Sequence, residues 1–198
     1  MPGADTTLPG PRASSVTQDG QDDGFVVGTG WSAEATPTGD TRIVASVPHE
    51  RLHDVLVTLI GALAPPLGVL YRRKVDRRTP GPENGPPTDF VGLDLAPERV
   101  ISALENARVL VASDARAELW FRGRMQEQIV LDGDGLLFCY PDDPMFRDAL
   151  QRAGVPPEDV PTMSERDYVK HWFRVDADAE EDALIDALRL TRVPSRRG

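Results

Sequence analysis

Two histidines and a glutamate near residue 50 have the residue types and the spacing of a metal site. The segment reads His49-Glu50-Arg51-Leu52-His53, so the two imidazoles are four residues apart. On an α-helix, side chains at i and i+4 point the same way, and two imidazoles placed like this can share one zinc ion. Glu50 would then be the general base that activates a zinc-bound water. His49 and His53 are therefore candidate metal ligands, and Glu50 is a candidate catalytic residue.

This pattern resembles the H-E-x-x-H motif of zinc peptidases over five residues. The resemblance implies a zinc-dependent hydrolase or peptidase with zinc as its cofactor. The segment departs from the motif because a charged Arg51 follows the glutamate and Pro48 places the motif in the first helical turn. A third ligand would come from elsewhere, with Glu98, Glu105 and His171 as candidates. The alternative interpretation is an amphipathic helix whose two histidines flank the apolar stripe and are partly buried.

The second candidate site is the acidic pair Asp132 and Asp134, which follows the apolar run Ile-Val-Leu. It resembles the first motif of haloacid dehalogenase-like phosphotransferases, in which the first Asp is the nucleophile and the second the acid/base. The usual Thr of that motif is Leu136 here. The letters Asp-Gly-Asp-Gly are also a strong hairpin signal, and a type I′ turn explains them without a ligand. We predict a turn, and phosphate chemistry would require a basic residue beside it.

Charge is distributed unevenly along the chain. It has 32 acidic and 22 basic residues and a net charge of −10, which disfavours binding to nucleic acid. Within residues 71–78, however, five of eight residues are basic. This basic segment either contacts an anionic partner or is the solvated end of a strand.

Neither a membrane-spanning run nor a secretory signal is recognisable. The longest apolar run, from Val55, is interrupted by Gly61 and by Pro65-Pro66. A single cysteine, Cys139, excludes an internal disulfide and fits a reducing compartment. We therefore expect a cytoplasmic protein that does not enter the membrane.

Apolar periodicity divides the chain into strands and helices. Strands are expected over 42–47, 67–75, 90–95, 118–123, 128–140 with a central turn, and 168–175; helices are expected over 48–63, 97–113, 145–155 and 180–190. Asp178 and Glu181 read as a capping box for the last helix. Because a hairpin interrupts the strand–helix alternation, we predict an α+β fold: a mixed, mainly antiparallel sheet with about four helices packed on one face.

Composition sets the expected domain limits. Residues 1–40 are rich in Gly, Pro, Ser and Thr and predict a disordered leader, although the apolar residues around Phe25 and Trp31 are able to form an edge strand. Residues 41–198 are predicted to form a single domain. A Pro-rich loop is expected at 79–88.

Two adjacent aromatic pairs point to a contact surface. On a strand, Trp120 and Phe121 face opposite sides of the sheet, as do Trp172 and Phe173. If helices cover only one side, one aromatic of each pair marks a partner surface on the other. The leading hypothesis is a non-enzymatic protein-binding module, of the adaptor or immunity type, with a protein partner and no cofactor; a homo-oligomer stays open. The alternative is the zinc-dependent hydrolase that uses His49, Glu50 and His53.

Overall fold

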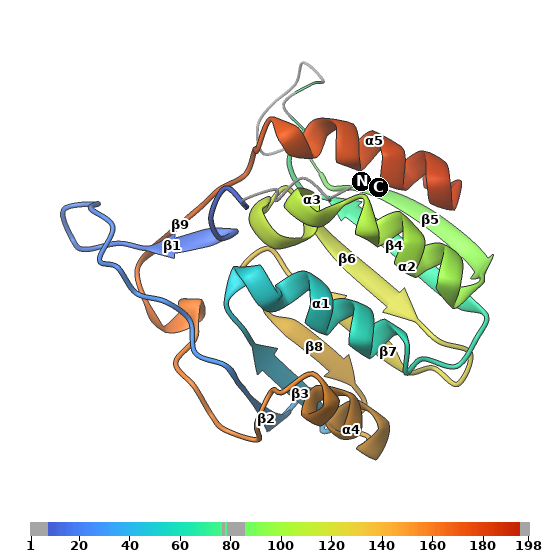
Figure 1. The fold of residues 1–198 in the computed structure, drawn as a ribbon, viewed down its shortest axis with the longest axis horizontal. Coiled ribbons are helices and arrows are strands. Elements are labelled where there is room, and N and C mark those ends of the chain that lie inside the picture. Colours follow the sequence, from blue (N-terminus) through green and yellow to red (C-terminus); the bar gives the residue numbers. More distant parts are fainter. Residues whose placement is uncertain (1–7, 77, 79–85, 195–198) are drawn as a thin grey trace, which may run out of the picture.

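The computed structural model describes residues 8–76, 78 and 86–194 of the chain (Figure 1). They form an α+β fold with one large sheet. Its eight strands are β2 (Gly30–Ala35), β3 (Thr41–Ser46), β4 (Leu67–Arg73), β5 (Thr88–Leu95), β6 (Ala117–Arg122), β7 (Gln128–Leu131), β8 (Leu137–Tyr140) and β10 (Thr191–Arg192). Their spatial order is β10-β5-β4-β6-β7-β8-β3-β2, and every neighbouring pair is antiparallel. The predicted fold class is confirmed.

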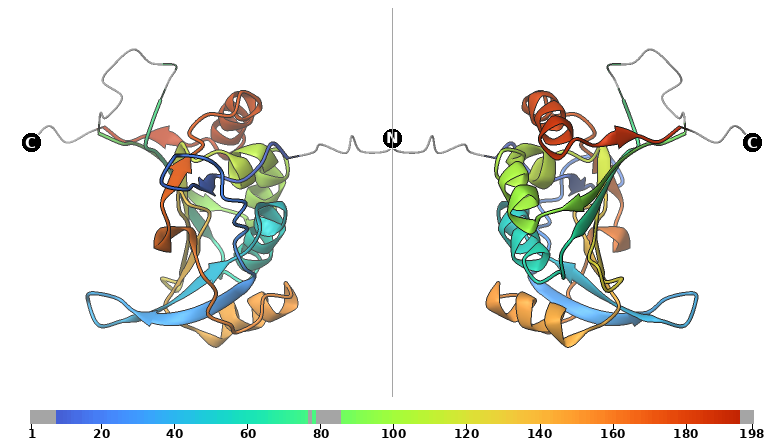
Figure 2. Two further views of the ribbon diagram at one scale, coloured as in Figure 1. Left: turned by 90° about the vertical axis from the view of Figure 1, so that its left-hand side faces the viewer. Right: turned by 90° about the vertical axis from the view of Figure 1, so that its right-hand side faces the viewer.

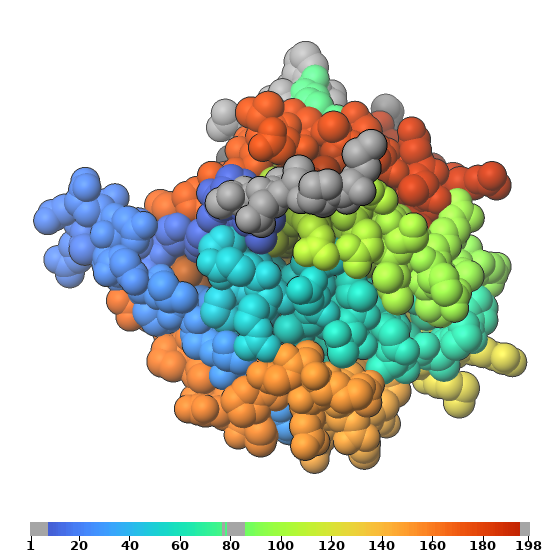
Figure 3. Space-filling model, viewed as in Figure 1, coloured from blue at the N-terminus to red at the C-terminus, as the bar shows by residue number. Residues whose placement is uncertain are grey.

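Five helices cover one face of this sheet, and Figure 2 shows them all on the same side. They are α1 (His49–Ile60), α2 (Pro97–Glu105), α3 (Arg108–Ser113), α4 (Pro144–Arg152) and α5 (Asp176–Leu188). Figure 3 views the molecule from this side, where α1, α4 and α5 form much of the surface. Among the described residues, no α-helix lies on the opposite side of the sheet, and the one other helical segment is the short 3-10 helix Met163–Glu165. We call that side the open face.

Proline and aspartate determine where the helices begin. Pro97 and Pro144 occupy the first turns of α2 and α4, where a missing N–H costs nothing, and Pro48 immediately precedes α1. The carboxylate of Asp143 accepts a hydrogen bond from the Met145 N–H at 2.8 Å and so caps α4. Three strand-to-helix corners, β3–α1, β5–α2 and β8–α4, therefore form where the sequence predicts them.

Strand alternation sends one set of side chains into the core. Inward residues of the central strands, such as Val69, Leu119, Phe121 and Ile129, are at most 2% exposed and pack against the helices. Cys139 lies in the same hydrophobic cluster as a free, buried thiol, and burial raises its pKa.

The region predicted as a disordered leader is folded over its described part. Residues 8–40 contain β1 (Ala13–Ser15) and β2, and β2 pairs with β3 along its whole length. Arg12 is 2% exposed and donates hydrogen bonds to the carbonyls of Leu110 and Val111. These partners are distant in sequence, so composition alone does not indicate the contacts. Trp31 lies in β2, so the edge-strand alternative describes this segment correctly.

The last predicted strand and helix need correction as well. Of residues 168–175, only β9 (Tyr168–Lys170) is a strand, and it pairs with β1 in a separate two-stranded sheet. The last helix begins at Asp176, before the expected start, so Asp178 and Glu181 lie inside it and form no capping box. The single domain over 41–198 stays a prediction. Residues 79–85 of the predicted Pro-rich loop lie outside the described residues, and Thr88 begins β5.

Candidate functional site

The three residues of the candidate metal site lie in two different environments. His49 and Glu50 line a cavity of about 220 Å³ between the start of α1 and residues 11–27, and burial lowers the pKa of His49. His53 is 2% exposed; its Nε2 donates to the carbonyl of Leu104 at 3.1 Å, and its Nδ1 lies 3.0 Å from Asp54 Oδ1. For His53 to bind zinc through Nε2, it would have to release Leu104.

The candidate third ligands have other partners or lie elsewhere. Glu105 forms an ion pair with Arg108, and His171 Nε2 lies 2.9 Å from the Ser14 hydroxyl. Glu98 is exposed in the first turn of α2. In the part of the chain that the structure describes, no group of three His, Cys, Asp or Glu residues is arranged to hold a metal ion.

The predicted turn at Asp132 is present, with a different geometry from the expected one. Gly135 is the only glycine of this turn with a positive φ, 87°, whereas a type I′ turn requires two such residues. Asp132 Oδ1 accepts hydrogen bonds from the N–H groups of Asp134 and Leu136 at 2.8 and 2.9 Å, and burial raises the pKa of Asp132. The turn is therefore held by its own aspartate.

A basic residue does lie beside this turn. Lys170 Nζ is 2.7 Å from Asp134 Oδ1, and the Tyr168 hydroxyl donates to Asp134 Oδ2 at 3.2 Å. Both oxygens of Asp134 therefore have partners within the protein. The carboxylate anchors β9 to the β7–β8 turn, which accounts for its position without a ligand.

The basic segment at residues 71–78 is neutralised by carboxylates from other elements. Arg72 forms two hydrogen bonds with Asp89 of β5, at 2.9 and 3.0 Å, and Lys74 pairs with Glu118 of β6. Arg73 instead points inward to Glu181 of α5. The described part of this segment is thus neither a simple solvated strand end nor an open anion site.

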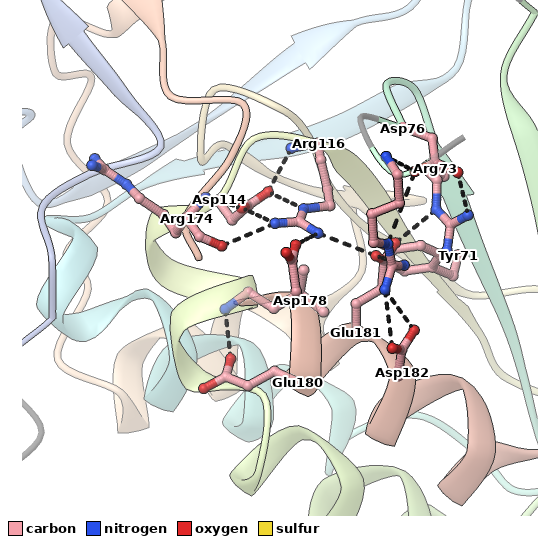
Figure 4. A network of polar contacts seen from close by, with 12 residues as sticks. Tyr71, Arg73, Asp76, Asp114, Arg116, Arg174, Asp178, Glu180, Glu181 and Asp182 are labelled. Atoms are coloured by element: carbon pink, nitrogen blue, oxygen red, sulfur yellow. Dashed lines mark hydrogen bonds and ion pairs between the residues drawn. The ribbon is translucent and has the colours of Figure 1, made fainter. Parts of the chain in front are cut away.

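Figure 4 shows how these inward charges join a buried network. Arg116 is 2% exposed and forms ion pairs with Asp114, Asp178 and Glu181 at 2.8, 2.6 and 3.2 Å. Burial alone would lower the pKa of Arg116, but its bonds to these carboxylates raise it overall. Asp114 and Glu181 are buried as well, whereas Asp178 is partly exposed, and the ion pairs connect the residues just before β6 to α5.

Glu181 is the centre of the same network. Its carboxylate accepts hydrogen bonds from the Tyr71 hydroxyl at 2.5 Å and from Arg73 Nε at 2.8 Å, and it also pairs with Arg78. Burial and the neighbouring carboxylate raise the pKa of Tyr71 well above its usual value. Every charge here has a partner within the protein, which is typical of a structural network.

The open face carries a continuous apolar row. Residues directly opposite each other on neighbouring strands are, in order, Val91, Leu70, Trp120, Val130, Phe138 and Val44. All but Val130 are partly exposed. The row crosses six strands, so at about 4.8 Å per strand it is about 24 Å long. A partly exposed apolar row of this length on an uncovered sheet is typical of an interaction surface.

Leu93 extends this surface beside the row. It is 70% exposed, and its Cδ2 lies 3.6 Å from the point where a Cβ on Gly68 would sit. Because Gly68 is opposite Arg122 and has no side chain, Leu93 occupies the space above it on the open face. We define the open-face patch as the apolar row together with Leu93.

Arginines lie over the aromatic rings of the patch. The guanidinium of Arg42 is 4.4 Å from the ring centre of Phe138, and that of Arg72 is 5.5 Å from Trp120. These cation–π contacts hold the rings in place without covering them by another element. Trp and Arg at the centre of an apolar surface are the residue types that dominate binding energy at protein interfaces.

One end of the open face is covered by other residues of the chain. A narrow pocket there is lined by Ser32, Val44 and Ser46 of the sheet together with Glu158 and Val160. The patch is therefore most accessible over β5, β4 and β6.

Sequence reasoning identified one residue of this patch. It placed Trp120 and Phe121 on opposite sides of the sheet, and the structure confirms this because Phe121 is 0% exposed while Trp120 lies on the open face. Trp172 and Phe173 lie outside any strand, so the same argument fails for them. The other residues of the row were missed because only strand register shows that they are neighbours. Their signal was the presence of apolar residues at outward as well as inward strand positions.

No described helix is both long enough and apolar enough to cross a membrane. No protein-family model matches the chain, and the searches of curated proteins and of solved structures also found no match.

Proposed function

We propose that this protein is a non-enzymatic protein-binding module, of the adaptor or immunity type, and that the open-face patch is its contact surface. The observation that carries the proposal is the apolar row across six strands on the open face, where the described residues form no α-helix. Burying partly exposed apolar surface against a partner is favourable at about 25 cal/mol per Å². The partner is a protein rather than a nucleic acid, because the net charge of −10 repels polyanions.

The distribution of polar groups supports binding over catalysis. The carboxylates and cations of the buried network are bonded to one another, and Asp132 and Asp134 stabilise a turn. A catalytic site needs groups held ready for a substrate, whereas these groups are occupied within the fold. We further propose a cytoplasmic location, which the free, buried thiol of Cys139 fits.

Co-purification from the native cell tests the proposal. The tagged full-length protein should recover a stoichiometric partner, and Leu93→Asp should abolish the recovery because it places a charge in the apolar contact. Val175→Asp is the matched control: Val175 is 74% exposed, close to the 70% of Leu93, but lies at the start of α5. Recovery of no stoichiometric partner, or of a homo-oligomer alone, would contradict the proposed function, and equal recovery by both variants would contradict the assigned surface.

A zinc-dependent hydrolase is the second candidate. It is favoured by the placement of His49 and Glu50 in one cavity, and by the lowered pKa of His49, since neutral imidazole is the form that binds metal. This candidate expects about one zinc per chain after purification without chelator, lost in His53→Ala. The protein-binding proposal expects no bound zinc, because His53 Nε2 is bonded to Leu104. Metal analysis of wild type and His53→Ala decides between the two.

A further inference from the structure

The charges around the open-face patch are unequal. Three carboxylates on the open face near the row are each paired with a cation: Glu34 with Arg42, Asp89 with Arg72 and Glu118 with Lys74. A further carboxylate, that of Asp94 next to Leu93, is exposed and forms no ion pair among the described residues, and two cations are in the same situation. Arg122, at the end of β6, forms no ion pair among the described residues. Arg124, two positions further along, is likewise exposed and without an ion pair there.

The location of Arg122 connects this excess charge to the apolar surface. Arg122 lies on the open face, because it alternates with the buried Phe121. Its cross-strand neighbours are Gly68, over which Leu93 lies, and Gln128. An exposed cation without a carboxylate partner thus borders the most exposed apolar residue of the patch. In a chain of net charge −10, this local charge favours a partner of opposite sign.

We propose that the partner is an acidic, apolar peptide segment whose apolar side chains lie along the row and whose carboxylate pairs with Arg122. This inference rests on the proposed function and specifies the chemistry of its partner. A row of about 24 Å is matched by a helix of about 16 residues at 1.5 Å per residue. A bidentate bond between Arg122 and a carboxylate would fix the orientation of the segment. Nucleic acid offers phosphates but no apolar side chains to cover the row.

Selection from a phage-displayed library of random 16-residue peptides tests this chemistry. The full-length protein should enrich peptides that combine Asp or Glu with large apolar residues. Their affinity should fall about tenfold in Arg122→Glu, because the new charge repels the peptide carboxylate. Arg152→Glu is the control: Arg152 is an exposed arginine in the last turn of α4, on the helical side, and this variant changes the net charge equally. It should leave the affinity within about twofold of wild type.

The outcomes separate this inference from the proposed function. Selected peptides whose binding is lost in Trp120→Ala and weakened in Arg122→Glu support both the inferred partner chemistry and the proposed function. Selected peptides that are not acidic, whose binding is lost in Trp120→Ala but unchanged in Arg122→Glu, overturn the inferred partner chemistry. The open-face patch would still be the binding surface in that case. Peptides that are insensitive to both substitutions, or a selection without enrichment, overturn both. A 16-nucleotide single-stranded DNA that binds wild type but not Arg122→Glu would assign the arginine to nucleic acid and contradict the peptide.

Discussion

The two faces of the sheet place similar residue types in opposite surroundings. On the helical side, Phe121 is fully buried, and Arg116 and Glu181 form a closed set of buried ion pairs. On the open face, the adjacent Trp120 is partly exposed, and Arg72 lies over its ring. The contrast between Phe121 and Trp120 comes from one strand, β6, because successive side chains of a strand point to opposite sides of the sheet.

This contrast separates stability from recognition. Removing a group from the helical side leaves a cavity or an unpaired buried charge, and either one destabilises the fold. Removing a side chain from the open face leaves no closed cavity, because that face is already partly in contact with water, and the fold is destabilised less. We therefore expect substitutions on the helical side to reduce stability more than substitutions on the open face. We expect substitutions on the open face to reduce partner binding more.

Arg116→Met should have the largest effect on stability. It leaves the fully buried Asp114 without the cation that pairs with it, and it removes one of the three cations that pair with the buried Glu181, so the free energy of unfolding should fall by about 3–5 kcal/mol. Urea denaturation followed by circular dichroism measures this. Arg122→Met on the open face is the matched substitution, expected to change stability by less than about 0.5 kcal/mol. Similar losses for both arginines would remove the distinction between the faces.

Phe121→Ala and Trp120→Ala compare two neighbouring residues directly. The first leaves a cavity in the core and should cost about 3 kcal/mol, whereas the second should cost about 1 kcal/mol because its site is partly solvated. Under conditions in which both variants are folded, Trp120→Ala should reduce partner binding more than Phe121→Ala. If Trp120→Ala binds as wild type does, the open face is not the contact surface.

Acidification should loosen the N-terminal strand by a smaller amount. Burial lowers the pKa of His171, whose ring contacts Ser14 of β1. The unfolded state then binds the proton more readily, so stability is lost as pH falls below about 6.5. Amide exchange of Ala13–Ser15, corrected for intrinsic rates, should be faster at pH 5.5 than at pH 7. An unchanged pH response in His171→Gln would assign the effect to another group, and His49 is the next candidate because burial lowers its pKa as well.

Leu93→Asp should have the smallest effect on folding. Its side chain is 70% exposed, so the free energy of unfolding should match that of Val175→Asp within about 0.5 kcal/mol, the range of surface substitutions. Thermal melts of the two variants measure this. A much larger loss in Leu93→Asp would mean that Leu93 is needed for packing, and its loss of binding would then have no separate meaning.

Local signals predicted the parts of the fold that local physics determines. Pro48, Pro97 and Pro144 mark the starts of three helices, and the Asp132 segment marks a turn. Long-range contacts determine the rest. β1 exists because it pairs with β9, more than 150 residues later, and nothing near residue 13 indicates it.

The candidate site shows the same limit. Asp178 and Glu181 have the spacing of a capping box, but Arg116 attracts both into a buried network. The alternation at residues 120–121 predicted which aromatic faces outward. The apolar row itself depends on the register of six strands, which no local pattern specifies.

Site-specific photo-crosslinking in the native cell tests the central claim most directly. A photoreactive amino acid replaces Leu93 on the open face in one variant and Val175 on the helical side in another; both positions are exposed and apolar. The account predicts a discrete crosslinked partner from position 93 and none from position 175. A partner captured from position 175 alone, or equally from both, would contradict the claim that the open face is the binding surface.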